Sequence, residues 1–344
     1  MKETRSIHRR DFAKSVGMAA AAAGIRTAAE AQAPADIKLG LYSITYLGLW
    51  YAGEALTLEQ VVERARKFGY HGVEIDGKRP HGNPLDMPPN RCRELRKFAE
   101  DRGVEIYAVA ANNDFSSPIP EFRESQLVYV RELIRMAADL QAPVLRVFLA
   151  WPGVTVLPEG GARYDLAKSI WEFTHKEFTP QQTWEWCRSG MKEAAKYAGD
   201  HGITLALQNH APVIGDYRDM LRMIREVDSP YLKACFDTRL EYGKRGQYLL
   251  DATREVGDLQ VLTHFGDEFT RMDGKIVPKE DEFLADQVAG LLEIGYRGYM
   301  GYELCHPLPR TEGRLPGIDF VDRNVELAAE YWRETMAKVK KDRG

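Results

Sequence analysis

Eight short apolar runs recur along the chain from residue 37 onward, and they constrain the fold more than any other feature. They are rich in Val, Ile, Leu and aromatic residues, as are parallel strands covered on both faces. The runs cover residues 37–43, 72–76, 104–110, 143–150, 203–209, 232–237, 260–266 and 299–304. Amphipathic stretches of helical periodicity separate them. Eight strands alternating with helices predict a (β/α)8 barrel.

The helical stretches carry start and stop signals. Residues 57–69 begin with Thr57, have Gln60 three positions later in a capping box, and end at Gly69. The alternative fold is an open, doubly wound sheet. Residues 43–53, which follow the first run, contain no G-x-G-x-x-G phosphate-binding motif. We therefore favour the barrel, as one domain over residues 34–344.

The first 33 residues have the pattern of an export signal. Residues 8–12, HRRDF, place paired arginines ahead of an Ala-rich apolar segment, and small residues follow at Ala29, Ala31 and Ala33. A basic start, a short apolar stretch and an A-x-A site are typical of a signal peptide, and the arginine pair favours the twin-arginine route. We expect residues 1–33 to be this signal, cleaved after Ala31 or Ala33, and the mature protein to be periplasmic or secreted.

Composition excludes some partners. Residues 1–31 carry six basic and three acidic residues, which leaves 41 and 48 in the rest of the chain and a net charge of −7. That balance argues against nucleic acid. Beyond the N-terminus no apolar run reaches the length of about 18 residues that spans a membrane. The cysteines lie singly in apolar or helical contexts, so we expect buried thiols, although an oxidising compartment would permit a disulfide: Cys92, Cys187, Cys235 and Cys305.

Polar residues stand at the ends of several predicted strands, where the active site of a (β/α)8 barrel lies. Four successive strands end in Gln208, Asp237, His264 and Glu303. An imidazole, two carboxylates and an amide oxygen form a mixed N/O set that suits a divalent cation. Mn²⁺ is the first choice, with Mg²⁺, Co²⁺ or Zn²⁺ as alternatives. Open positions on such an ion would let a substrate hydroxyl and carbonyl chelate it.

Five segments around these residues identify a family more specifically together, in this order, than any one of them does alone. They are GVEIDG, LALQNH, CFDTR, THFGDE and YMGYEL. On them the chain resembles the xylose-isomerase-like barrel superfamily of sugar isomerases and epimerases, which includes ketose 3-epimerases and keto-inositol dehydratases. The resemblance covers roughly residues 37–305. It implies metal ligands at Asp237, His264 and Glu303, and it places Gln208 where relatives have a glutamate ligand. Arg239 and Leu240 stand where a Gly-His pair is common.

The glutamine raises the main question. In the epimerases that the chain resembles, one carboxylate removes a proton α to a carbonyl and a second reprotonates the opposite face. An amide is not a base, although its oxygen can still bind a metal. Three hypotheses remain open: an isomerase or epimerase in which another residue returns the proton, a keto-sugar dehydratase or lyase, and a non-catalytic sugar- or metal-binding barrel.

Residue roles follow from this resemblance. We expect Glu303 to be the carboxylate base, with His210 or Glu74 as its partner. Aromatic side chains would stack on the faces of a sugar or keto-sugar, although each could instead be core: Tyr46, Trp50, Trp151 and Trp171. Asn113 and Arg239 would donate hydrogen bonds to it. No phosphate-binding loop is visible, and whether the chain forms a homo-oligomer is left open.

Overall fold

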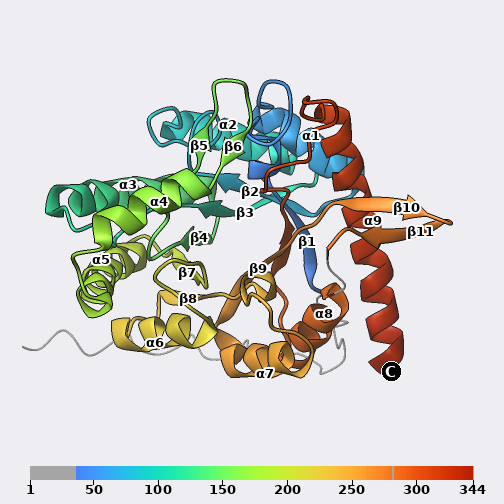
Figure 1. Cartoon of the computed structure of the whole chain (residues 1–344). Helices are drawn as coiled ribbons and strands as arrows, with labels where there is room; N and C mark the ends of the chain where they lie inside the picture. The colour runs from blue at the N-terminus through green and yellow to red at the C-terminus, as the bar shows by residue number, and fades with distance from the viewer. Residues whose placement is uncertain (1–35, 281–282, 344) are drawn as a thin grey trace, which may run out of the picture. The chain divides into compact units, whose positions relative to one another are not determined.

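The structure is a computed structural model that describes residues 36–280 and 283–343. The predicted signal at residues 1–33 lies outside these ranges. Eight parallel strands close into a barrel in the order β1-β12-β9-β8-β7-β4-β3-β2 (Figure 1). They are β1 (Lys38–Tyr42), β2 (Gly72–Asp76), β3 (Glu105–Ala110), β4 (Val144–Val147), β7 (Thr204–Gln208), β8 (Leu232–Cys235), β9 (Gln260–Phe265) and β12 (Tyr299–Tyr302). Each predicted run forms one of them, and the (β/α)8 barrel is confirmed.

A helix follows each barrel strand, and these helices surround the sheet (Figure 1). They are α1 (Leu58–Phe68), α2 (Pro89–Glu100), α3 (Pro120–Leu140), α5 (Pro180–Asp200), α6 (Tyr217–Val227), α7 (Gln247–Val256), α8 (Leu284–Glu293) and α9 (Ile318–Arg343). None of the helices within residues 36–280 and 283–343 is long and apolar enough to cross a membrane.

Helix α1 shows how local sequence sets these bounds. The Thr57 hydroxyl accepts a hydrogen bond from the Gln60 backbone, and the Gln60 side chain accepts one from the Thr57 backbone. This capping box satisfies two donors that the first turn leaves free. Gly69 ends the helix in the left-handed region, at φ 77°, which glycine adopts without strain.

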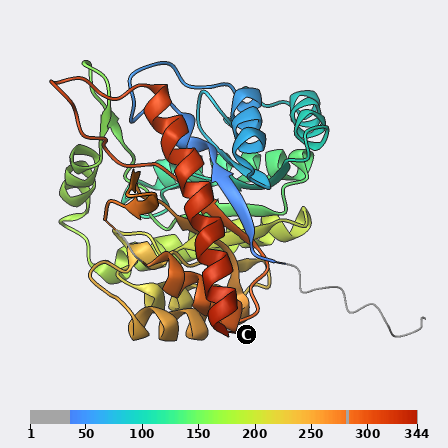
Figure 2. The ribbon, with the colours of Figure 1, turned by 90° about the vertical axis from the view of Figure 1, so that its right-hand side faces the viewer.

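The long C-terminal helix α9 closes the ring of helices. It packs against α8 and α1 and runs along the outside of the barrel near β1 (Figure 2). Tyr70 donates a hydrogen bond to the backbone carbonyl of Val325 at 2.8 Å. The buried face of α9 includes Val321, Val325 and Trp332.

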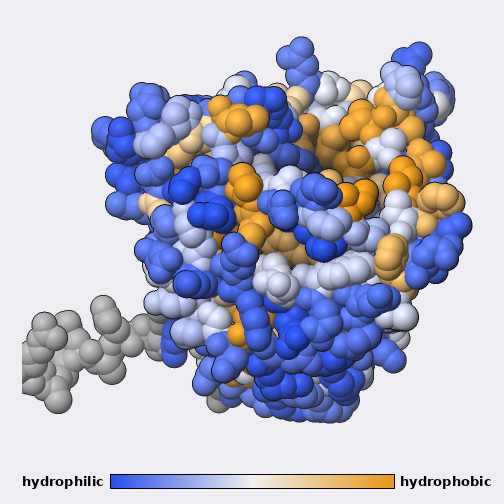
Figure 3. Space-filling model, turned by 90° about the vertical axis from the view of Figure 1, so that its left-hand side faces the viewer, coloured by the Kyte–Doolittle hydropathy of each residue, from blue (hydrophilic) through white to orange (hydrophobic). Residues whose placement is uncertain are grey.

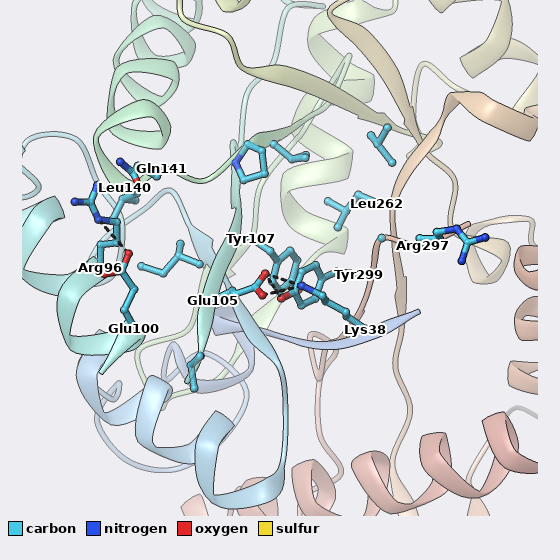
Figure 4. A pocket seen from close by; sticks show the side chains of 16 residues that line it. Lys38, Arg96, Glu100, Glu105, Tyr107, Leu140, Gln141, Leu262, Arg297 and Tyr299 are labelled. Atoms are coloured by element: carbon cyan, nitrogen blue, oxygen red, sulfur yellow. Dashed lines mark hydrogen bonds and ion pairs between the residues drawn. The ribbon is translucent and has the colours of Figure 1, made fainter. Parts of the chain in front are cut away.

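The N-terminal end of the barrel is filled by an aromatic pair. The rings of Tyr107 and Tyr299 stack with their centroids 3.9 Å apart, as Figure 4 shows. The Tyr299 hydroxyl donates to Glu105 at 2.7 Å, and Lys38 donates to the same carboxylate at 2.7 Å. A hollow lies beside this pair. Because residues at the N-terminal end of such a barrel serve stability, we place the functional site at the other end.

The chain between β4 and α5 is an excursion at the C-terminal end of the barrel. It holds a small hairpin of β5 (Thr155–Val156) and β6 (Ala162–Arg163), followed by α4 (Asp165–His175). A second hairpin, β10 (Phe269–Met272) with β11 (Lys275–Pro278), follows β9. Apolar side chains gather around a hollow on the side where α4 and the β5–β6 hairpin lie (Figure 3).

All four cysteines are free thiols, as expected from their spacing. Cys92, Cys187 and Cys235 are buried, and Cys305 is half-buried.

Candidate functional site

A pocket of about 460 Å³ opens at the C-terminal end of the barrel. This volume is within the range of small-ligand sites. Aromatic side chains form much of its wall: Tyr42, Trp50, Phe148, Trp151, Tyr164 and Tyr242. Trp151 packs against two of the others, with its ring centroid 5.2 Å from that of Phe148 and 5.9 Å from that of Tyr164. The wall therefore offers flat apolar faces of the kind that cover a sugar ring.

Polar groups face the same pocket from five barrel strands or the loops that follow them. They are Lys78, Asn112, Arg146, Gln208, His210, Glu303 and His306. Pockets that bind small molecules combine an apolar wall with a few such groups, which fix the orientation of the ligand.

At the base of the pocket, five side chains, two of which also line it, form a closed circuit of hydrogen bonds across the barrel. Arg146 donates from Nε to Glu74 Oε1 at 2.8 Å and from Nη1 to Gln208 Oε1 at 2.8 Å. Gln208 Nε2 donates to Asp237 Oδ2. His264 contacts Asp237 Oδ2 through Nδ1 at 3.0 Å and Glu74 Oε2 through Nε2 at 2.6 Å. We call these five residues the barrel circuit.

The charges of the barrel circuit balance in the buried interior. Burial opposes ionisation of Glu74, but Arg146 and His264 outweigh it and hold the pKa of Glu74 below its ordinary value. Burial likewise opposes the charge on His264, but Asp237 and Glu74 hold its pKa well above the ordinary value. A histidine whose two nitrogens both meet carboxylates is the imidazolium form, which donates from both. Two cations thus face two carboxylates.

Gln208 occupies the one position in the circuit that needs a donor and an acceptor together. An arginine side chain only donates, and an ionised carboxylate only accepts. Gln208 lies between Arg146 and Asp237, so its oxygen faces the guanidinium and its nitrogen faces the carboxylate. A glutamate could satisfy Arg146 but would meet Asp237 with like charge. The circuit gives a physical reason for an amide at the end of β7.

His210 lines the pocket just beyond the end of β7. Its Nδ1 hydrogen-bonds the backbone carbonyl of Ala211, and its ring packs edge-on against Trp151 with centroids 5.0 Å apart. Burial and the nearby charge of Arg146 lower the pKa of His210 to about 4, although the Ala211 carbonyl acts in the opposite direction. The imidazole is therefore neutral at neutral pH, with its proton on Nδ1 and a lone pair on Nε2.

Glu303 lines the same pocket, from the segment that follows β12. The Cys305 thiol hydrogen-bonds to it, and burial together with the Glu303 charge raises the pKa of that thiol. Two strands, β9 and β8, separate β12 from β7 around the barrel. Glu303 and His210 therefore approach the pocket from well-separated parts of the wall.

The predicted catalytic and metal-binding residues fall into two groups. Gln208 and His264 each contact Asp237 directly, and Glu74 joins them through His264. Glu303 and His210 line the pocket, whereas Glu74 does not. The catalytic role that we expected for Glu74 stays a prediction.

Two predicted substrate-binding residues line the pocket and two do not. Trp50 and Trp151 are in its wall. Asn113 instead pairs with the backbone of Phe148: its Nδ2 donates to the Phe148 carbonyl at 2.7 Å, and its Oδ1 accepts from the Phe148 N–H at 3.0 Å. Arg239 lies outside the pocket, near Gly266. Their roles toward a substrate stay predictions.

The other two aromatic candidates also lie outside the pocket wall. Tyr46 is buried and donates to Asp322 at 2.7 Å. Trp171 donates to Ser116 at 2.8 Å and stacks on His175. Both side chains therefore have structural partners.

The expected metal-binding quartet does not fit a cation in this arrangement. Gln208 Oε1 accepts from Arg146, and both nitrogens of His264 are used by carboxylates. Asp237 Oδ1 accepts from the His264 backbone at 2.7 Å, and its Oδ2 accepts from Gln208. A positive guanidinium in contact with the amide oxygen would also repel a divalent ion placed there.

A different trio brings potential ligand atoms together. Atoms of Cys235, Asp237 and His264 lie within 4.8 Å of one another, so this trio could share an ion only if Asp237 and His264 gave up their contacts in the barrel circuit. Burial, followed by the charge of Asp237, raises the pKa of the Cys235 thiol to about 12, so the sulfur keeps its proton at neutral pH.

Arg146 is the residue that sequence reasoning missed. It lies in the buried middle of β4 and is 3% exposed. A signal was present, because a charged residue inside an apolar strand run requires a buried partner. GVEID contains two charged residues, Glu74 and Asp76, and PVLRVFLA contains one, Arg146; Glu74 and Arg146 pair with each other.

Comparison with known proteins agrees with the barrel fold. The family model described as xylose isomerase-like TIM barrel matches residues 62–324. Fructoselysine 3-epimerase of Shigella flexneri is 23% identical over 295 residues, which cover 82% of this chain and 98% of that protein.

Two solved structures share the fold. D-psicose 3-epimerase from Clostridium cellulolyticum H10, solved with D-tagatose, has a TM-score of 0.63 and 19% identity, and the match covers 87% of this chain and 99% of that one. The apo form of 3-keto-D-glucoside 4-epimerase from E. coli has a TM-score of 0.60 and 17% identity, with 89% and 100% covered.

Proposed function

The chain belongs to the xylose isomerase-like TIM barrel family, and on this basis we propose that it is an isomerase or epimerase of a sugar or keto-sugar. The reaction begins with removal of a proton from the carbon α to a carbonyl group. A relative that covers most of the chain is named a fructoselysine 3-epimerase, and proteins of the same fold are named epimerases of free sugars or a keto-glucoside.

One observation carries the proposal: two groups able to accept a proton line one aromatic pocket from well-separated strands. They are the carboxylate of Glu303 and the neutral imidazole of His210. Epimerisation needs proton removal on one face of a carbon and proton return on the other, so two separated groups are required. In this proposal Glu303 removes the proton from one face, and His210 returns a proton to the opposite face after its Nε2 has taken one from solvent.

The pocket wall supports a sugar as substrate. Trp50 and Trp151 lie in its aromatic wall, and Asn112 and Lys78 line the same pocket. The Trp50 Nε1 group is buried and has no hydrogen-bond partner among the described residues. A buried donor without a partner costs stability, so a ligand hydroxyl is a reasonable acceptor for it.

A keto-sugar dehydratase or lyase is the second candidate, and the state of Gln208 favours it. Strand β7 supplies no carboxylate, and the Gln208 amide is held by Arg146 and Asp237. If no group returned the proton to carbon, the carbanion would instead expel a neighbouring leaving group. Product analysis separates the two reactions.

Exchange of substrate hydrogen with solvent tests the proposal. The protein is incubated in D₂O with a panel of ketoses and 3-keto-glycosides, and deuterium at the α-carbon is followed by NMR. We expect exchange with at least one substrate, and Glu303→Gln should slow it by about 10²–10⁴-fold. The matched control is Glu159→Gln, an exposed glutamate at the same end of the barrel that does not line the pocket.

The outcomes separate the hypotheses. An epimerised product supports the first candidate, and a dehydrated or cleaved product supports the second. Sugar binding without exchange on any substrate would point to the non-catalytic barrel and contradict the proposal.

We also propose export by the twin-arginine route, with residues 1–33 as the signal and residues 34–344 as the mature barrel domain. The support is the HRRDF segment followed by the Ala-rich stretch and the A-x-A site. The full chain and an Arg9→Lys/Arg10→Lys variant are expressed in a bacterium and fractionated. A shortened, periplasmic product that the variant loses is the expected result, and an uncleaved product in both would contradict export.

A further inference from the structure

The barrel circuit places a fixed positive charge at the point where the family resemblance predicts a metal ion. Arg146 reaches from β4 to the amide oxygen of Gln208, which would otherwise be a ligand atom. Its guanidinium is held by Glu74 through Nε and is 4.6 Å from the ring centroid of Tyr42. Three contacts in different directions fix this cation in the base of the pocket.

One donor of this guanidinium is left over. Nε and Nη1 are used within the circuit, whereas Nη2 is buried and has no partner among the described residues. Arg146 also lines the pocket, with Gln208 and Glu303. An unused, charged donor in a buried position of the pocket wall is suited to an oxygen of a bound ligand that carries or develops negative charge.

We propose that Arg146 takes the place of the divalent cation of this family, and that its Nη2 group binds the carbonyl oxygen of the substrate. This inference deepens the proposed function and depends on it for the identity of the ligand. When Glu303 takes the α-proton, the electron pair of the C–H bond forms the C=C bond of an enediolate. The carbonyl oxygen becomes the oxyanion beside Arg146. No oxidant or further reactant is needed.

The glutamine and the arginine are explained together by this assignment. A glutamate at position 208 with no neighbouring arginine would offer a carboxylate to a metal. Gln208 instead uses its oxygen for Arg146 and its nitrogen for Asp237, which keeps the circuit neutral without an added ion. The two residues form one arrangement rather than two separate departures.

Manganese binding tests the assignment without reference to activity. The chain is treated with EDTA, and Mn²⁺ is titrated and followed by electron paramagnetic resonance. The wild type should bind Mn²⁺ weakly and without a defined stoichiometry. The Arg146→Ser/Gln208→Glu variant opens the position and supplies a carboxylate, so it should gain one site with a Kd at least about tenfold lower.

A matched control distinguishes the effect of vacating the place of Arg146 from the effect of lowering the net charge of the protein. Lys78 lines the same pocket, and Lys78→Ser/Gln208→Glu changes the net charge by the same amount without vacating the place of Arg146. This control should gain no site. An equal gain in both double variants, or one tight Mn²⁺ per wild-type chain that His264→Ala abolishes, would overturn the proposal.

The manganese titration can still be carried out if the Arg146→Ser variant does not fold. If Arg146→Ser prevents folding because Glu74 loses its partner, Glu74→Gln/Arg146→Met removes the pair together and carries the same Gln208→Glu change. The wild-type titration decides on its own if tight binding is found.

Deuterium exchange at the α-carbon of the substrate tests the same assignment through activity. Wild-type exchange should survive EDTA, and Arg146→Lys, which keeps the charge but not the fork geometry, should slow it by about 10²–10³-fold. Exchange abolished by EDTA and restored by Mn²⁺ would overturn the assignment of Arg146. Absence of exchange in the wild type contradicts the proposed function, while the manganese titration still decides whether Arg146 holds the place of the cation.

Discussion

The amide oxygen of Gln208 accepts a hydrogen bond from Arg146 Nη1 at 2.8 Å, and the nitrogen of the same amide donates to Asp237. One neutral side chain thereby joins a buried cation to a buried carboxylate. The fold of the family is kept, and the described side chains at the strand ends pair their charges with one another in the barrel circuit.

Gln208→Glu should destabilise the protein by about 1–3 kcal/mol, because the change removes a donor from Asp237 and sets two carboxylates side by side in a buried site. The free energy of unfolding from urea titration measures this. Gln181→Glu is the matched control, since Gln181 also donates to an acidic neighbour, Glu185, but is exposed. The control should change stability by less than about 0.5 kcal/mol. Equal effects at both positions would contradict the role of the circuit.

Trp50→Phe should weaken binding of a substrate sugar by about threefold to tenfold, because the lost Nε1 donor is worth about 0.5–1.5 kcal/mol. Stability should fall only through the packing lost with the smaller ring, since the buried donor that disappears has no partner among the described residues. Calorimetric titration and thermal unfolding measure the two effects. Trp332 has the same kind of unpartnered Nε1 but lies on α9, so Trp332→Phe should leave sugar affinity unchanged. Affinity unaffected by Trp50→Phe would remove this residue from the binding site.

Stability should fall as the pH drops below about 6.5, in part through His81. His81 is buried between the Ser43 hydroxyl at 3.0 Å and the Leu56 carbonyl at 2.9 Å, and burial lowers its pKa. The unfolded chain therefore binds a proton at a higher pH than the folded chain. The stabilisation is complete above the unfolded pKa and is lost as the pH falls through the folded pKa.

Urea unfolding at about pH 8 and about pH 5 measures this slope. His81→Gln should show a shallower decline than the wild type. His201→Gln, at the half-exposed end of α5, serves as the control and should keep the wild-type slope. A variant at position 81 with an unchanged slope would show that other groups cause the decline.

Gly40→Ala should lower the free energy of unfolding by about 1–3 kcal/mol, because a Cβ there would overlap the Tyr107 hydroxyl oxygen. Tyr107 cannot swing away, since its ring is stacked on Tyr299 inside the barrel. Gly317→Ala, where a Cβ meets nothing within 4 Å, should be close to neutral. The midpoint of thermal unfolding distinguishes them, and a neutral Gly40→Ala would mean that the aromatic pair is loosely packed.

Local sequence determined the barrel. Strand and helix positions follow from apolar periodicity and capping residues, which act over a few neighbouring positions, so all eight strands could be located in advance. The order of strands around a closed barrel then brings polar residues at the strand ends to one side of the molecule. This is why Gln208, Asp237 and His264 could be grouped from the sequence, and why a pocket lined by Trp50, Trp151 and Glu303 was expected there.

Only the tertiary structure decided how these groups are used. Arg146 and Glu74 are separated by 72 positions, and Glu74 and His264 by 190, so no local pattern connects them. In a buried site each donor and each charge must find a partner, and the partner is chosen by side-chain direction in three dimensions. That requirement joined three of the expected metal ligands in a circuit of paired charges, and it left one buried guanidinium donor of Arg146 without a partner among the described residues.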